Sequence, residues 1–93
     1  MLEKEIESKL VREVKKIGGL CWKFVSPGVV GVPDRLILLV GGKAAFVECK
    51  APSKTLRKIQ LKRKKQLEDL GFKVYVLDSK EDVEGIICDI RSS

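Results

Sequence analysis

The sequence predicts a small α/β domain with a mixed β-sheet, on three observations. Two apolar runs, residues 35–40 and 44–49, flank the pair Gly41-Gly42, which is typical of a β-hairpin. Apolar residues recur at helical spacing over residues 2–17. A further apolar run, residues 73–77, follows a segment of helical length, and such a crossover returns a strand parallel to its neighbour. The predicted order is therefore α-β-β-β-α-β-α, with helices covering the sheet.

The boundaries of these elements follow from residues that break or cap regular structure. Gly18-Gly19 ends the first helix, Ser26-Pro27-Gly28 breaks the first strand, and Gly71 ends the second helix. Ser79 is expected to cap the last helix. The expected elements are helices over residues 2–17, 56–70 and 80–88 and strands over residues 20–25, 35–40, 44–49 and 73–77.

Length and composition indicate one globular domain over residues 1–93. The chain is 44% hydrophobic, and a core of this size makes oligomerisation a useful source of further stability. No run approaches the roughly 20 apolar residues of a membrane span. The start MLEKEIESKL is charged and helical in pattern, unlike a signal peptide, so we expect a cytoplasmic protein that does not bind membranes.

The chain contains three lone cysteines and no histidine, which narrows its chemistry. Without histidine there are no Ser–His or Cys–His nucleophile pairs, and a zinc site of the usual Cys/His kind is nearly excluded. Catalysis would therefore use carboxylates, lysines and a hard metal ion.

Positive charge is concentrated in one segment of a chain whose net charge is +6. Residues 53–66 contain no acidic residue, which favours a polyanionic partner such as nucleic acid; a merely solvated helix face is the alternative. Lys23 and Ser26, just before the Pro/Gly loop, are two further candidate phosphate contacts, with simple exposure to solvent as the alternative. The basic residues of the segment are Lys54, Arg57, Lys58, Lys62, Arg63, Lys64 and Lys65.

Three charged residues lie at the ends of the hairpin strands. Asp34 precedes one strand, whereas Glu48 and Lys50 end its partner, and antiparallel pairing brings these ends to one edge of the sheet. Glu48 and Lys50 share a face, and Cys49 points to the other. Two close carboxylates favour Mg²⁺ or Mn²⁺, the Cys49 carbonyl could add a ligand, and a lysine can stabilise charge on a phosphate. The alternative is a surface Glu-x-Lys ion pair.

Glu7 is a fourth candidate for this site. It is bracketed by Leu10, Val11 and Val14 on the first helix, so its side chain is expected to face the sheet. A carboxylate that faces inward fits a functional site better than a surface position. The alternative is a favourable charge near a helix N-terminus.

These motifs resemble those of a known family. "GVPD" before a strand and "FVECK" after the hairpin turn resemble the PD-(D/E)XK nuclease signature. With Glu7 on the leading helix and Gln60 in the following one, the chain is similar to the VRR-NUC family (virus-type replication-repair nucleases) from about Glu3 to Leu77. Its compact size is also similar to that of archaeal Holliday junction resolvases. The resemblance implies a compact, restriction-endonuclease-like α-β-β-β-α-β core.

The resemblance also implies roles for individual residues. Asp34 and Glu48 would bind Mg²⁺ or Mn²⁺ with the Cys49 backbone carbonyl, Lys50 would orient the attacking water, and Glu7 would hold a second metal ion or a water on it. Gln60 would contact the site, although an uncommitted surface glutamine is an equal alternative.

The function implied by the resemblance is an endonuclease that cuts branched DNA, such as four-way (Holliday) junctions. It would be a phage- or prophage-encoded homodimer in the bacterial cytoplasm, with no small organic cofactor. A nucleic-acid-binding module without catalysis and a structural subunit are the competing hypotheses.

Overall fold

The computed structural model describes residues 2–93, so only the first residue of the predicted domain lies outside the described part. The predicted order of helices and strands is confirmed, with one 3₁₀ turn added before the last helix. Between residues 2 and 93, none of the helices combines the length and the apolar character needed to span a membrane. The elements are α1 (Glu3–Lys16), β1 (Leu20–Lys23), β2 (Arg35–Leu39), β3 (Lys43–Cys49), α2 (Lys58–Asp69), β4 (Val74–Leu77), η1 (Lys80–Asp82) and α3 (Val83–Arg91).

The four strands form one mixed sheet in the order β1-β2-β3-β4. β1 and β3 each pair antiparallel with β2, and β4 runs parallel to β3 after the α2 crossover. Gly41 and Gly42 have φ values of 89° and 72°, which glycine adopts readily, and they close the hairpin between β2 and β3. The mixed sheet is confirmed, and the hairpin sets the start of β2 beside the end of β3.

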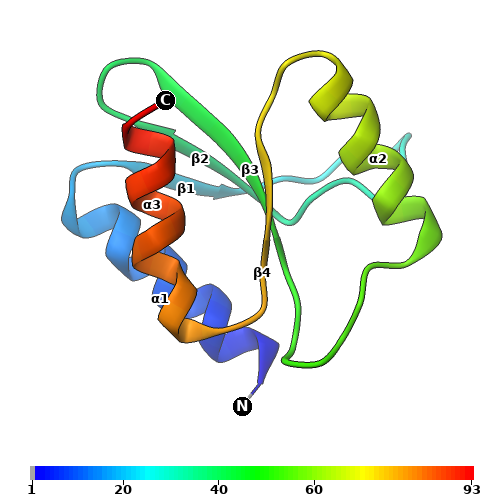
Figure 1. The fold of residues 1–93 in the computed structure, drawn as a ribbon, viewed down its shortest axis with the longest axis horizontal. Coiled ribbons are helices and arrows are strands. Elements are labelled where there is room, and N and C mark those ends of the chain that lie inside the picture. Colours follow the sequence, from blue (N-terminus) through cyan, green and yellow to red (C-terminus); the bar gives the residue numbers. More distant parts are fainter. Residues whose placement is uncertain (1) are drawn as a thin grey trace.

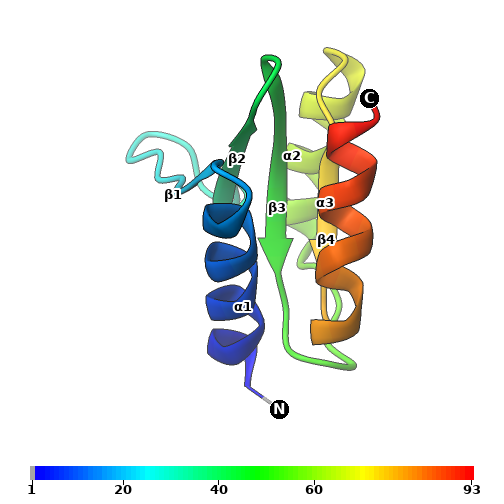
Figure 2. The ribbon, with the colours of Figure 1, turned by 90° about the vertical axis from the view of Figure 1, so that its left-hand side faces the viewer.

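Helices cover both faces of the sheet. α1 and α3 pack side by side on one face, whereas α2 lies on the other (Figure 1 and Figure 2). Ile6, Leu10 and Val14 of α1 form a fully buried stripe at helical spacing. They join Ile37 and Val47 of the sheet in a single apolar cluster, and each such side chain contributes about 1.5–3 kcal/mol on burial. This packing fixes α1 against the two strands that carry the predicted site.

The predicted side-chain cap at Ser79 is wrong. The Ser79 side chain makes no capping hydrogen bond. Its backbone carbonyl instead accepts a hydrogen bond from the Asp82 N–H at 3.4 Å, which closes the 3₁₀ turn. α3 then runs to Arg91 rather than ending at Cys88. The burial of Ile90 in the core stabilises this last turn of the helix.

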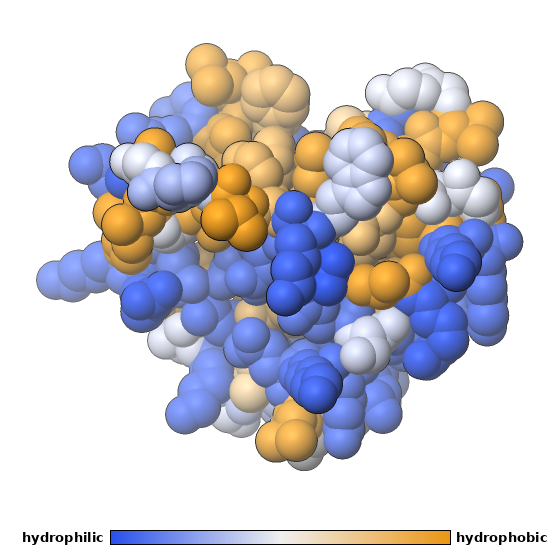
Figure 3. All heavy atoms as spheres, turned by 180° about the vertical axis from the view of Figure 1, so that it is seen from behind, coloured by the Kyte–Doolittle hydropathy of each residue, from blue (hydrophilic) through white to orange (hydrophobic). Residues whose placement is uncertain are grey.

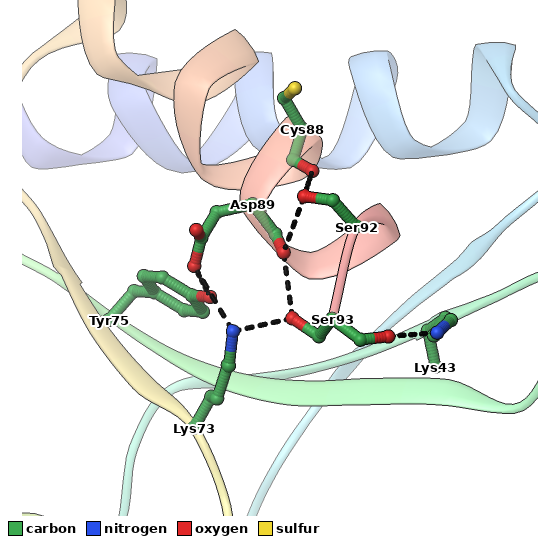
Figure 4. Close-up of polar contacts among 7 residues, drawn as sticks. All are labelled: Lys43, Lys73, Tyr75, Cys88, Asp89, Ser92 and Ser93. Carbon is green, nitrogen blue, oxygen red and sulfur yellow. Dashed lines mark hydrogen bonds and ion pairs between the residues drawn. The ribbon is translucent and has the colours of Figure 1, made fainter.

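Polar contacts attach the end of α3 to the sheet (Figure 4). The Tyr75 hydroxyl donates to Asp89, and Lys73 Nζ lies 3.4 Å from Asp89 Oδ2. Lys43 Nζ donates to the Ser93 carbonyl. Exposed ion pairs of this kind contribute about 0–1 kcal/mol, so the apolar contacts of α3 hold it in place.

The loop before Asp34 lies directly against α2. Gly31 has a φ of 88°, and a Cβ there would lie 2.9 Å from Ile59 Cγ1 and 3.0 Å from the Ile59 carbonyl oxygen. Only glycine permits both this backbone conformation and this close approach. Gly31 therefore links the position of α2 to that of the loop that ends at Asp34.

We expect Gly31→Ala to lower the free energy of unfolding by roughly 2–4 kcal/mol, because positive-φ strain and overpacking against Ile59 add together. Urea denaturation measures the change. Gly18→Ala tests strain alone, since φ is 80° there and the space is open, and Gly28→Ala tests neither effect. Equal stability of the Gly31→Ala and Gly18→Ala variants would show that contact with Ile59 does not constrain the loop.

Candidate active site

Asp34 is held in place at the end of β3. Its Oδ2 accepts a hydrogen bond from the Cys49 backbone N–H at 2.8 Å. Its own backbone carbonyl accepts a hydrogen bond from the Phe24 N–H at 2.8 Å, and Pro33 beside it is buried. Burial raises the pKa of the Asp34 carboxyl, and the hydrogen bond from Cys49 partly offsets this. Asp34 is thus hydrogen-bonded to the end of β3 and to the residue that follows β1, which are the two strands that flank β2.

Glu48 is a buried carboxylate with one unpartnered oxygen. The residue is 4% exposed. Its Oε2 accepts a hydrogen bond from Gln60 Nε2 at 2.7 Å and lies 3.8 Å from Lys50 Nζ. Its Oε1 is buried with no hydrogen-bond partner among the described residues. Such an orphaned oxygen costs stability, and it marks a place where a cation or a proton would fit.

The electrostatics of the site agree with its geometry. Burial raises the pKa of Glu48 to about 7, the negative charge of Asp34 adds to this rise, and the Lys50 ammonium opposes it. Glu3, at the start of α1, also raises this pKa. The ionisation of either carboxylate therefore disfavours that of the other unless positive charge lies between them.

Gln60 bridges α2 and the site. It is the one buried residue of α2 and is 8% exposed. Its Oε1 accepts a hydrogen bond from the Arg57 backbone N–H at 2.9 Å, so its amide nitrogen is turned toward Glu48. The structure thus places Gln60 in contact with the site. Its position three residues after the helix cap is a weak signal of this orientation.

Glu7 faces the sheet, as expected, but pairs with Arg35. Arg35 Nε lies 2.6 Å from Glu7 Oε2, and Arg35 Nη1 donates to the Cys21 carbonyl at 3.2 Å. Arg35 and Ile37 are two residues apart on β2 and therefore share the face that α1 covers, whereas Glu48 faces α2. Over residues 2–93, no three His, Cys, Asp or Glu side chains gather as a metal-binding group. The structure therefore brings Asp34, Glu48, Lys50 and Gln60 together and holds Glu7 apart, on Arg35.

The predicted nucleic-acid contacts divide into two groups. Arg63 Nε donates to the Val30 carbonyl at 2.8 Å, and Lys64 pairs with Glu68 at 2.8 Å, so both already have partners within the chain. Ser26 is half-buried and its carbonyl accepts from the Val29 N–H. The remaining candidates are exposed and make no ion pair within residues 2–93: Lys23, Lys54, Arg57, Lys58 and Lys62.

The donors at this site suit a hard cation. Asp34 and the orphaned Glu48 Oε1 offer carboxylate oxygens, which Mg²⁺ and Mn²⁺ prefer. The three cysteines are free, and burial raises the pKa of the Cys49 thiol and raises that of Cys21 to about 11. These two sulfurs therefore stay protonated, which leaves an oxygen-only set.

Comparisons with known proteins agree with this description. No family model matches the sequence. The chain is 54% identical over 79 residues, 85% of its own length and 85% of the relative's, to "Putative nuclease p44" of Acyrthosiphon pisum secondary endosymbiont phage 1. It also resembles a solved structure of a VRR_NUC domain, with a TM-score of 0.86, 28% identity and coverage of 91% of this chain and 92% of that one.

The fold and the paired carboxylates at the ends of the two central strands, β2 and β3, thus define a compact PD-(D/E)XK nuclease-like domain. Within that class, the chain belongs to the VRR-NUC family, so the predicted family and fold class are confirmed.

We expect Glu48→Gln to be more stable than the wild type above pH 7 when a chelator removes divalent metals. The folded pKa of Glu48 is about 7 against an ordinary 4.5. Its contribution to stability is therefore complete below pH 4.5 and is lost as the pH rises through 7. The difference in unfolding free energy should grow from near zero at pH 4 to the order of 3 kcal/mol at pH 8.

Urea denaturation between pH 4 and pH 8 measures this difference. Glu68→Gln is the control, since that exposed carboxylate only pairs with Lys64. A difference between Glu48→Gln and the wild type that stays constant with pH would contradict the prediction.

Proposed function

We propose that this chain is a divalent-metal-dependent, structure-selective endonuclease that hydrolyses phosphodiester bonds in DNA. The observation that carries the proposal is the buried Glu48 with its unpartnered Oε1, beside the half-buried Asp34. Carboxylates with raised pKa values in a partly buried cluster are costly to maintain and gather at functional sites. Membership of the VRR-NUC family supports nuclease chemistry at this cluster.

Asp34, Glu48 and the Cys49 backbone carbonyl would hold the Mg²⁺ or Mn²⁺ ion. When bound, the ion supplies Lewis-acid charge at the scissile phosphate. Lys50 lies 3.8 Å from Glu48 and would orient the attacking water and stabilise charge on the phosphate. Gln60 donates to Glu48 and so orients that carboxylate. Glu7 would take part as a second-ion ligand only after its carboxylate leaves Arg35.

The substrate we propose is branched DNA, with four-way junctions as the first candidate. Lys54, Arg57, Lys58 and Lys62 lie exposed on α2 and the segment before it and would neutralise backbone phosphates. A homodimer would suit a junction, because two sites related by a two-fold axis match two symmetric strands. The phage relative supports an action in the cytoplasm of a bacterial host.

We expect Asp34→Asn, Glu48→Gln and Lys50→Met each to lower the cleavage rate at least about 100-fold, because the first two remove carboxylates that would hold the metal ion and the third removes positive charge at the reacting phosphate. The assay incubates four-way junction, flap, nicked and linear DNAs with Mg²⁺ or Mn²⁺. Asp69→Asn, an exposed carboxylate on α2, is the control and should cleave like the wild type.

Circular dichroism checks that each variant folds. Full cleavage activity of the Asp34→Asn or Glu48→Gln variant would contradict the proposal. A wild type that binds every DNA but cuts none in either metal would favour a binding module without catalysis.

We expect Gln60→Ala to reduce activity about 10–100-fold and to raise the Mg²⁺ concentration needed for half-maximal rate, because Glu48 loses the donor that orients it. The matched control is Gln66→Ala on the same helix, where the exposed glutamine only accepts from Arg63. Metal titrations of the cleavage rate compare the two variants. An unchanged metal requirement for Gln60→Ala would show that Gln60 only anchors the start of α2.

A further inference from the structure

We infer that a hollow beside α1 binds a second segment of nucleic-acid backbone, on the other side of the carboxylate pair from α2. This inference rests on the proposed function and deepens it, since it specifies the shape of substrate that the site accepts. The hollow, termed the α1 groove, has a volume of about 480 Å³. Its charged lining is Lys4, Glu7, Arg12, Lys15, Lys23 and Arg35.

The charge of the α1 groove is strongly positive. Five cations face one carboxylate, Glu7, and that carboxylate is already paired with Arg35. Within residues 2–93, Lys4, Lys15 and Lys23 have no carboxylate within 4.0 Å, and Arg12 has only the exposed contact with Glu13 at 3.8 Å. Like charges gathered without counter-charges repel one another, and a polyanion would relieve that repulsion.

The cations follow a line that matches a nucleic-acid strand. Lys4, Arg12 and Lys15 recur along one side of α1, with Ser8 between them. At 1.5 Å per residue, Lys4 and Lys15 are about 16 Å apart along the helix, which corresponds to roughly five nucleotide steps of one duplex strand. Hydrophilic side chains predominate over the lower half of the molecule seen from behind, with a few apolar ones among them (Figure 3).

The α1 groove reaches Arg35, the residue next to Asp34 in the sequence. Lys23 pairs with Arg35 in the sheet register, and Arg35 directly follows Asp34. The α2 cations lie across the sheet, on the side to which Glu48 points. A backbone that reaches the pair would therefore be contacted from two sides, which suits a substrate with two duplex segments meeting at the cut.

A neighbouring hollow shows that this charge pattern is specific to one side of α1. The hollow between α1 and α3 is lined by Glu13, Glu84 and Arg91 together with apolar side chains such as Ile17 and Ile87. Its carboxylates already pair with Lys16 and Lys9, so this hollow has no comparable set of unpaired cations. Helix α1 thus separates a groove suited to a polyanion from one that is not.

The test removes the three unpaired lysines of the α1 groove. A Lys4→Ala, Lys15→Ala, Lys23→Ala variant is compared with a control in which Lys43, Lys73 and Lys80, which already contact Ser93, Asp89 and Glu5, are changed to alanine. Both variants lose three positive charges. Affinities for a four-way junction, for a linear duplex and for polyglutamate are measured in EDTA between 50 and 200 mM salt, conditions that need no cleavage.

We expect the α1-groove variant to bind the junction about 10–100-fold more weakly, with a salt slope smaller by about 2–3, while its linear-duplex affinity changes less. The control should bind both DNAs like the wild type. Junction binding and salt slope equal to those of the control would overturn the inference. So would a loss confined to an acidic polypeptide such as polyglutamate, since the partner would then be a protein.

These experiments distinguish a failure of the proposed nuclease activity from a failure of the proposed α1 groove. If the wild type binds the junction but never cleaves it, and the α1-groove variant binds it more weakly than the control, the α1 groove is supported and the nuclease is contradicted. An α1-groove variant that binds and cleaves the junction like the wild type contradicts the inference about the groove and leaves the proposed nuclease activity supported.

Discussion

The hydrogen bond from the Cys49 backbone N–H to Asp34 Oδ2 is the contact on which the site depends. It joins the residue before β2 to the last residue of β3, so the pairing of the hairpin also determines the position of the first carboxylate. Glu48 is adjacent to Cys49 and alternates to the other face, where Gln60 reaches it. Two carboxylates thus meet because one antiparallel ladder is in register.

Keeping that pair together opposes the stability of the fold. A buried carboxylate with an orphaned oxygen and a second carboxylate nearby is unfavourable, and Lys50 and Gln60 offset only part of the cost. The apolar cluster of α1, α3 and the sheet carries this cost. Arg35 neutralises Glu7 in the same way on the opposite face, so each acidic residue that points inward has a basic or amide partner.

The surface cations are likewise divided between the α2 side and the α1 side of the sheet. Arg63 and Lys64, although part of the basic segment, are used to hold the 26–31 loop and α2. Lys54, Arg57, Lys58 and Lys62 stay free on one side, and Lys4, Lys15 and Lys23 on the other. A count of charges in the sequence does not separate these roles, since whether a cation is paired depends on which helix turn or loop lies opposite it.

The sequence by itself determined the order of the elements, the hairpin and the approach of Asp34 to Glu48 and Lys50. These follow from periods of 3.6 and 2 residues and from glycine turns, which are local properties. Only the tertiary structure decided that the buried Gln60 donates a hydrogen bond to Glu48, that Arg35 forms an ion pair with Glu7 and that the Ser79 side chain makes no capping hydrogen bond. Those outcomes depend on how α1 and α2 are docked on opposite faces of the sheet, and helix docking is set by core packing between residues far apart in the chain.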